Sequence, residues 1–255
     1  MYSGIFDSHA HYDDERFDPD REEVIAALQD NGVVNVIDIG CDLQTSRKAV
    51  ELADRHSFFY AAVGYHPHEA DSFNEEDFAE IEQMLKHPKV VALGEIGLDY
   101  HYDLSPRDKQ MEVFDRQLKL AEELDVPIII HTREATQDTL NLLEKHNCRG
   151  VVHCYSGSAE TAKILVGMGY YIGFTGVITF PNARKIVGAC DVVPPDRILL
   201  ETDCPYMAPV PFRGKRCWSP MIEKTAERVA EIKGMEPQAL IDIARDNIKR
   251  LFGIE

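Results

Sequence analysis

Two histidines spaced as His-x-His lie near the start of the chain, in the stretch Phe6–His11. If this stretch is a strand, Asp7, His9 and His11 share one face, because side chains alternate between faces. Neutral imidazole nitrogen is a strong ligand for divalent metals, so the pair could form half of a metal site. It could equally be an ordinary surface or core pair. The choice between the two depends on whether the chain supplies further ligands.

Further histidines and acids lie within or directly after short apolar runs, which are typical of strands. They are His66, Glu95, His131, His153 and Asp203. In a barrel of parallel strands the carboxyl ends meet on one rim, where barrel enzymes build their sites. Each residue alone is weak evidence, since a histidine after an apolar run is often a satisfied core-edge residue. The shared position of His9, His11, His131 and His153 with the acids Glu95 and Asp203 predicts a common metal site.

Four imidazoles with two carboxylates suit two divalent ions about 3.5–4 Å apart. We predict one ion on His9, His11, Glu95 and Asp203, and a second on Glu95, His131 and His153. Glu95 lies between the histidine groups along the chain and is the expected bridge. A single-metal site that uses part of this set is the open alternative.

Such a metal pair predicts hydrolysis, because bound cations lower the pKa of water and neutralise charge in the transition state. We assign catalytic roles to Glu95, as the bridge, and to Asp203, which could ligate one ion and accept a proton from the attacking water. Glu201 lies one strand period before Asp203. It is either an orienting group behind the ligands or a packed core carboxylate.

Several residues near these positions could contact a phosphate or a base. Arg133 lies two positions after His131 and could make a bidentate contact with a phosphodiester through two of its N–H groups. The cluster Arg213, Lys215 and Arg216 follows the last predicted strand, although a solvated charge run is the plain alternative. Tyr155 could stack on a base, or simply pack. His66 could contact the substrate, or pack against Pro67.

The elements that must position these residues alternate regularly between strand and helix. Strands are predicted at 6–11, 33–40, 58–65, 90–96, 126–131, 151–154, 170–174 and 197–202. Helices are predicted after Asp18-Pro19-Asp20 and at 46–56, 75–86, 107–124, 135–146, 159–168, 183–190, about 221–233 and 237–251. This α/β pattern predicts a (β/α)8 TIM barrel, formed as a single domain over residues 1–255. A doubly wound sheet is disfavoured, because no Gly-rich turn follows the first strand.

Composition narrows the possible partners and the compartment. The net charge of −17 argues against a protein that coats duplex nucleic acid through a broad basic face. Six dispersed cysteines suit a reducing cytoplasm. We see no signal peptide and no apolar run long enough to span a membrane, and we expect a cytoplasmic, soluble protein.

The chain resembles the TatD family of metal-dependent deoxyribonucleases, within the metal-dependent hydrolase superfamily. The matching stretches are 7–11 (DSHAH), 64–67 (GYHP), 94–100 (GEIGLDY), 130–133 (IHTR), 153–157 (HCYSG) and 201–206 (ETDCPY). The resemblance implies a barrel whose ligands are His9, His11, Glu95, His131, His153 and Asp203. It also implies magnesium-dependent, typically exonucleolytic activity on DNA. Cys217 stands where the family commonly has Asn, which leaves the contacts of that loop open.

We therefore expect a monomeric deoxyribonuclease that acts on single-stranded DNA ends with two divalent cations. Mg²⁺ or Mn²⁺ are the expected working ions, and Zn²⁺ or Ni²⁺ could occupy the purified protein because imidazole binds them tightly. The same metal site could instead serve an amidohydrolase or lactonase, since fold and metals do not choose the substrate. A metal-binding or nucleic-acid-binding module without activity is a third hypothesis.

Overall fold

The computed structural model describes residues 2–255, in which strands and helices alternate along the chain. The strands are β1 Ile5–Ala10, β2 Val33–Ile39, β3 Phe59–Val63, β4 Val90–Asp99, β5 Ile128–Arg133, β6 Gly150–Val152, β7 Tyr171–Phe174 and β8 Ile198–Leu200. The helices are α1 Arg21–Ala27, α2 Leu43–Arg55, α3 Glu75–Met84, α4 Arg107–Leu124, α5 Thr136–Leu143, α6 Ala159–Gly167, α7 Arg184–Val192, α8 Ile222–Lys233 and α9 Pro237–Phe252. None of the helices in residues 2–255 is both long and apolar enough to cross a bilayer.

The eight strands form one sheet in the order β1 to β8, with neighbours that follow one another along the chain. The pairs β1–β2, β3–β4, β4–β5, β5–β6 and β7–β8 are parallel. This order, with a helix after each strand, confirms the predicted (β/α)8 TIM-barrel class. A doubly wound sheet would break the chain order at a switch point.

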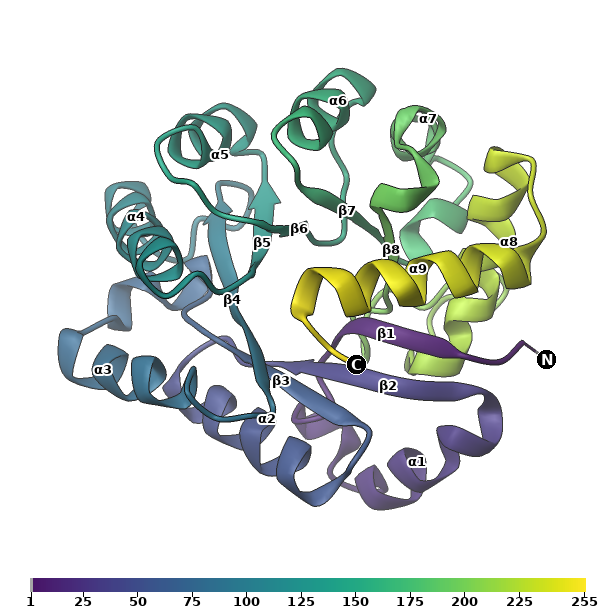
Figure 1. Ribbon diagram of the computed structural model, residues 1–255, viewed down its shortest axis with the longest axis horizontal. Helices are drawn as coiled ribbons and strands as arrows, with labels where there is room; N and C mark the ends of the chain where they lie inside the picture. Colours follow the sequence, from purple (N-terminus) through teal and green to yellow (C-terminus); the bar gives the residue numbers. More distant parts are fainter. Residues whose placement is uncertain (1) are drawn as a thin grey trace. The chain divides into compact units, whose positions relative to one another are not determined.

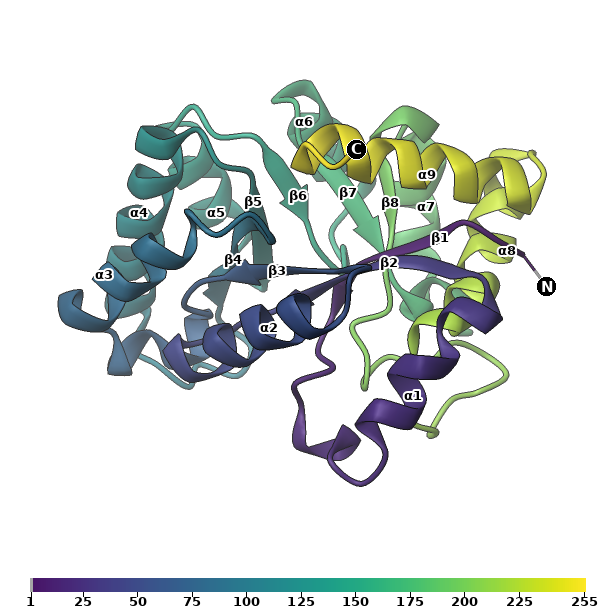
Figure 2. The same cartoon turned by 60° about the horizontal axis from the view of Figure 1, so that its bottom comes forward.

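The chain divides into two compact units, one of residues up to Asp38 with Cys154–Glu255 and the other of Ile39–His153. In the first unit, α9 lies beside β1 and β8 (Figures 1 and 2). Its buried side chains Leu240, Ala244, Ile248 and Leu251 recur at helical spacing and form one apolar face. This face covers the amino-terminal strand, which carries the His-x-His pair.

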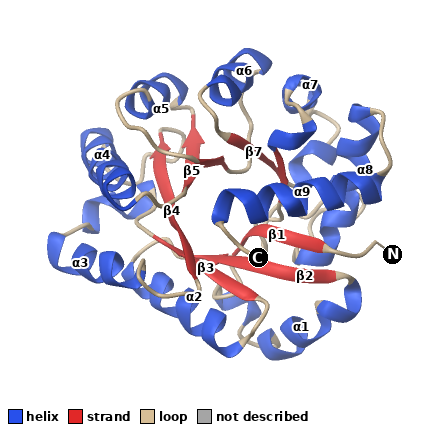
Figure 3. Cartoon of the chain, viewed as in Figure 1, coloured by secondary structure: helices blue, strands red, loops and turns tan. Residues whose placement is uncertain are grey.

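In the second unit, α4 and α5 pack beside β4 and β5 (Figure 3). Helix α4 buries an apolar stripe and also two glutamines, Gln110 and Gln117. The Gln117 side chain accepts from the backbone N–H of Tyr65 (2.8 Å) and donates to its carbonyl (3.0 Å). Gln110 makes the same pair of bonds with the backbone of Asp99 (2.8 and 3.1 Å). Helix α4 therefore fixes the backbone just before His66 and at the end of β4.

Helix α4 matches its predicted bounds, whereas several strand ends were wrong. Strand β4 runs to Asp99, beyond the predicted end at Ile96, because its pairing with β5 continues through Asp99↔Arg133. Glu95 therefore lies inside β4. Strand β6 ends at Val152, so His153 follows the strand that was predicted to contain it.

Candidate metal centre

In the first unit, His9, His11 and Asp203 form a cluster of candidate ligands. The Nε2 atoms of His9 and His11 lie 3.2 Å apart. Oδ1 of Asp203 lies 3.8 Å from Nε2 of His9 and 3.5 Å from Nε2 of His11. The two nitrogens and the carboxylate oxygen thus converge on one point.

Backbone bonds between the ends of β1 and β8 create this cluster. The N–H of Asp203 donates to the carbonyl of His9 (2.9 Å), and the N–H of His11 donates to the carbonyl of Cys204 (2.8 Å). Asp203 itself has a left-handed φ of 64°, which non-glycine residues adopt rarely. The chain thus turns sharply where the carboxylate must face the histidines.

Asp7 links β1 to the segment after β8 through side-chain hydrogen bonds. Its fully buried carboxylate accepts from the N–H (3.0 Å) and the hydroxyl (2.6 Å) of Thr202. Burial raises the pKa of Asp7 to about 6, although the bonds from Thr202, Ser219 and His9 oppose this shift. Asp7 therefore orients the segments that carry His9 and Asp203, because its carboxylate is hydrogen-bonded to Thr202.

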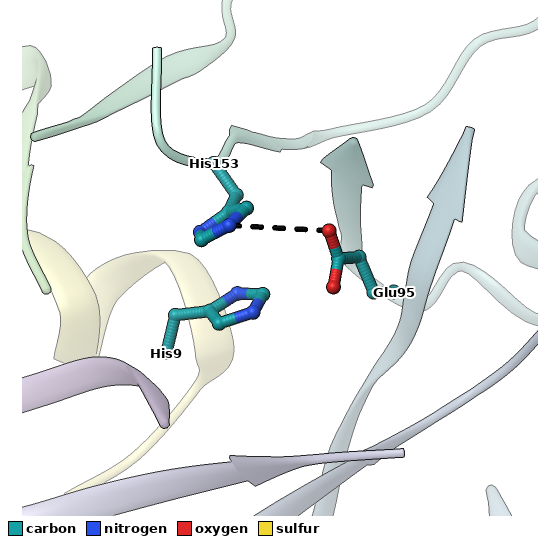
Figure 4. Close-up of side chains that lie close together, drawn as sticks. All are labelled: His9, Glu95 and His153. Atoms are coloured by element: carbon teal, nitrogen blue, oxygen red, sulfur yellow. Dashed lines mark ion pairs between the residues drawn. The ribbon is translucent and has the colours of Figure 1, made fainter. Parts of the chain in front are cut away.

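In the second unit, the carboxylate of Glu95 lies among three imidazoles. Oε1 is 2.9 Å from Nδ1 of His131 and 3.6 Å from Nε2 of His66. It is also 3.9 Å from Nε2 of His153, and Figure 4 shows that ring turned towards the carboxylate. Glu95 is only 3% exposed, so these imidazoles surround a buried charge.

Each unit holds a group of candidate ligand atoms that lie close together, His9, His11 and Asp203 in the first unit and His66, Glu95 and His131 in the second. Two nitrogens at 2.0–2.1 Å from one zinc ion, at a tetrahedral angle, lie about 3.3 Å apart. The separations of 2.9–3.8 Å between these ligand atoms bracket that value. Imidazole and carboxylate together suit zinc, nickel or manganese. Each unit thus holds a His/carboxylate cluster that is able to bind metal.

His131 makes a second carboxylate contact, with Asp99, which was not predicted from the sequence. Its Nε2 lies 2.9 Å from Oδ2 of Asp99, and Nε2 of His68 lies 3.1 Å from the same oxygen. The signal that could have found it is strand parity, because Asp99 follows Glu95 by four residues and shares its face of β4. The predicted end of the strand at Ile96 left Asp99 in a loop and hid this signal.

These contacts shift the pKa values of His131 and Asp99 in opposite directions. Burial lowers the pKa of His131, but the bonds with Asp99 and Glu95 outweigh it and raise the pKa to about 9. Burial favours a higher pKa for Asp99, yet bonds from His131, Tyr102 N–H and His68 hold it well below its usual range. A cation at Glu95 would replace the proton on Nδ1, so its binding should strengthen as the pH rises.

A backbone contact fixes the tautomer of neutral His66. Its Nδ1 accepts the backbone N–H of His68 (3.2 Å), so a neutral ring carries its proton on Nε2. That nitrogen faces Glu95 at 3.6 Å. The neutral imidazole is therefore a hydrogen-bond donor towards Glu95, as a substrate contact requires, and His66 also belongs to the candidate ligand group with Glu95 and His131.

Of the other predicted substrate contacts, Arg133 and Arg213 stack on aromatic rings, and Arg213 and Lys215 are exposed. The guanidinium of Arg133 lies over the ring of Tyr102, 4.7 Å from its centroid, and Tyr102 is 54% exposed. Arg213 and Lys215 are exposed, and Arg213 stacks on Phe180 at 3.9 Å.

The contacts of Arg216 and Tyr155 favour structural roles over substrate binding. Arg216 forms a bidentate pair with Asp20, which neutralises one charge of the basic loop. Tyr155 is 4% exposed and donates its hydroxyl to the carbonyl of Ser158 (2.7 Å), which leaves little ring surface for a base.

Glu201 is buried and holds two backbone regions beside candidate ligands. Oε1 accepts the N–H of Cys154 (2.6 Å), directly after His153, and Oε2 accepts the hydroxyl of Ser8 (3.3 Å), directly before His9. Of the two interpretations of Glu201, these contacts favour the orienting group.

Comparison with known proteins agrees with this chemistry. The family model "TatD related DNase" matches residues 6–253. The uncharacterized metal-dependent hydrolase YabD of Bacillus subtilis (strain 168) is 44% identical over 98% of this chain and 99% of its own length. The protein named 3'-5' ssDNA/RNA exonuclease TatD of Cronobacter sakazakii (strain ATCC BAA-894) is 34% identical over 97% of each chain. The crystal structure of YJJV, a TatD homolog from Escherichia coli k12, superposes with a TM-score of 0.93 at 30% identity and covers 100% of both chains. The chain therefore belongs to the TatD family of metal-dependent hydrolases.

Proposed function

We propose that this protein is a metal-dependent deoxyribonuclease that cleaves phosphodiester bonds at single-stranded DNA ends. The observation that carries the proposal is the buried carboxylate of Glu95 among the imidazoles of His131, His66 and His153. A relative that is 34% identical carries the name ssDNA/RNA exonuclease, which supports a nucleic acid as the substrate.

On this proposal, His9, His11 and Asp203 hold one cation, and Glu95, His131 and His153 hold the other. Bound divalent cations would activate a water and neutralise charge on the phosphate. Mg²⁺ or Mn²⁺ are the expected ions in use. That Glu95 also ligates the first ion, and so bridges the pair, stays a prediction from the sequence.

The chain's own groups supply the proton transfer and the grip on the substrate. Asp203 would be the proton acceptor for the attacking water, because its carboxylate lies beside His9 and His11, where the first cation and its water would be held. His66 donates its Nε2–H to a phosphate oxygen. Arg133, two residues beyond His131 on β5, offers a guanidinium to the same phosphate or its neighbour.

Farther contacts fall to the exposed Arg213 and Lys215 of the loop after β8. Their exposed positive charges suit contacts with the phosphate backbone of a single strand. We propose that the protein acts as a monomer, since the groups named here all come from one chain.

The experiment is an assay of metal-stripped protein, reconstituted ion by ion, on end-labelled single-stranded and double-stranded DNA. We expect Mg²⁺-dependent or Mn²⁺-dependent release of nucleotides from single-stranded ends. Glu95→Gln should abolish it, whereas Glu80→Gln should not, because Glu80 is an exposed partner of Arg47. Activity that survives both chelation and Glu95→Gln would contradict the proposal. Hydrolysis of amides or lactones in a parallel panel, with no cleavage of DNA, would favour the amidohydrolase or lactonase alternative.

A further inference from the structure

Asp99 is a fully buried carboxylate at the end of β4 whose two oxygens have separate tasks. Oδ1 accepts the backbone N–H groups of His101 (2.9 Å) and Tyr102 (2.8 Å). Oδ2 faces the side chains of His131 (2.9 Å) and His68 (3.1 Å). One oxygen thus holds the turn after β4, and the other holds two imidazoles.

The contact with His131 decides which ring nitrogen can bind a cation. An ionised carboxylate only accepts hydrogen bonds, so Nε2 of His131 must carry a proton towards Asp99. The lone pair of the neutral ring is then on Nδ1, the nitrogen that lies 2.9 Å from Oε1 of Glu95. The same ring therefore presents its ligand atom to Glu95 and its donor to Asp99.

We propose that Asp99 is a positioning residue that fixes His131 as an Nδ1 ligand for the cation at Glu95. Carboxylates that accept the second N–H of a metal-bound histidine orient the ring and increase its basicity. This inference rests on the proposed metal role of Glu95 and His131, but it does not depend on the identity of the substrate.

The structure also shows how to separate this role from a purely structural one. In Asp99→Asn, the amide oxygen can keep both backbone bonds to the turn, while the amide NH₂ replaces Oδ2. A donor then faces Nε2 of His131, which must become an acceptor, so the ring proton moves to Nδ1 and opposes a cation at Glu95. A residue that only holds the turn would lose little in this substitution.

His68→Gln is the matched control. It removes the other imidazole on Oδ2 but leaves Asp99 and its contact with His131 in place. Side-chain exposure of His68 is 24%, compared with 0% for Asp99, so the control also disturbs less packing.

The experiment measures Zn²⁺ binding to the metal-stripped chain by competition with a chromophoric chelator, with no nucleic acid present. Asp99→Asn should weaken the binding of one ion by about 10–100-fold, which is the usual effect of losing the hydrogen-bond partner of a metal-bound histidine. His68→Gln should stay within about three-fold of the wild type, because Asp99 still accepts the bond from His131. Circular dichroism and thermal melting check that both variants are folded.

A second measurement uses only the unmutated protein, so it decides the proposal even if Asp99→Asn fails to fold. Two-bond ¹H–¹⁵N NMR of the Zn²⁺-loaded chain, with His131 assigned through His131→Ala, should show a ring protonated on Nε2 and metal-bound through Nδ1. A ring protonated on Nδ1 would overturn the proposal. Folded Asp99→Asn that binds Zn²⁺ within two-fold of the wild type would overturn it too. Neither result depends on whether the protein cleaves DNA, because no substrate is present.

Discussion

Gly173→Ala tests how Glu201 holds the chain beside the ligands. Gly173 lies on β7, and a Cβ placed there would lie 2.6 Å from Oε2 of Glu201 and closer still to Oε1. Such separations are far inside van der Waals contact, so the carboxylate must move by about 1 Å. Because Glu201 is completely buried, it has no solvent-facing position to take.

The displacement should break the 2.6 Å bond from the N–H of Cys154 and loosen the bond from Ser8. A hydrogen bond to a charged group contributes about 1.5–3 kcal/mol, and a buried group left unsatisfied costs a similar amount. We therefore expect Gly173→Ala to lower the free energy of unfolding by about 2–4 kcal/mol.

The assay is urea unfolding of the metal-free protein, followed by far-UV circular dichroism. Gly188→Ala is the matched control, because Gly188 lies inside α7 and the added Cβ would have nothing within 4 Å of it. It should stabilise the protein by about 0.5–1 kcal/mol through helix propensity.

A double-mutant cycle identifies the cause of the loss. In a Glu201→Ala background, Gly173→Ala should cost less than about 0.5 kcal/mol, because the clashing carboxylate is gone. An equal cost in both backgrounds, or a loss below about 0.5 kcal/mol in the otherwise unmutated chain, would refute the reasoning.

Three further predictions concern charge, proton transfer and thiol reactivity. Arg133→Gln should lower kcat/KM on single-stranded DNA by about 10–100-fold through loss of one charged hydrogen bond, and an unchanged kcat/KM would contradict a phosphate contact. Asp203→Asn should lower kcat by about 10²–10⁴-fold, because the proton acceptor is lost; near-normal turnover would reassign that role. Burial, aided by Glu122, raises the pKa of the Cys148 thiol to about 11. Its thiolate fraction at pH 8 should therefore be about 100-fold below that of a thiol of pKa 9, and iodoacetamide should label it slowly until the pH approaches 11. Labelling at the rate of a free thiol would contradict this.

Elements with strong local signals could be predicted from the sequence. Helix α4 has the expected bounds because its apolar stripe recurs at helical spacing and Pro106 precedes it. The short strands β6 and β8 coincide with predicted apolar runs, but their bounds differ from the predicted ones. Strand ends depend on pairing with a neighbour that is distant in the sequence, and an apolar run does not show where that pairing stops.

The candidate ligands could be predicted from the sequence because histidines and acids are unusual at the ends of apolar runs. Their partners could not. Asp99 contacts His131 across 32 positions, and Arg216 pairs with Asp20 across 196 positions. The tautomer of His66 depends on one backbone N–H. Strand parity could indicate Asp99 only once the end of β4 is known, whereas the Arg216–Asp20 pair and the tautomer of His66 follow from the folded arrangement alone.

The most direct test of the metal centre is the number of ions that the purified chain retains. After loading with Mn²⁺ or Zn²⁺ and dialysis, elemental analysis should find about two ions per chain, as a binuclear site requires. The variant with both His9→Ala and His11→Ala should retain about one, because Glu95, His131 and His153 are intact. A wild type that holds a single ion, or a double variant that loses both ions or keeps both, would contradict the account.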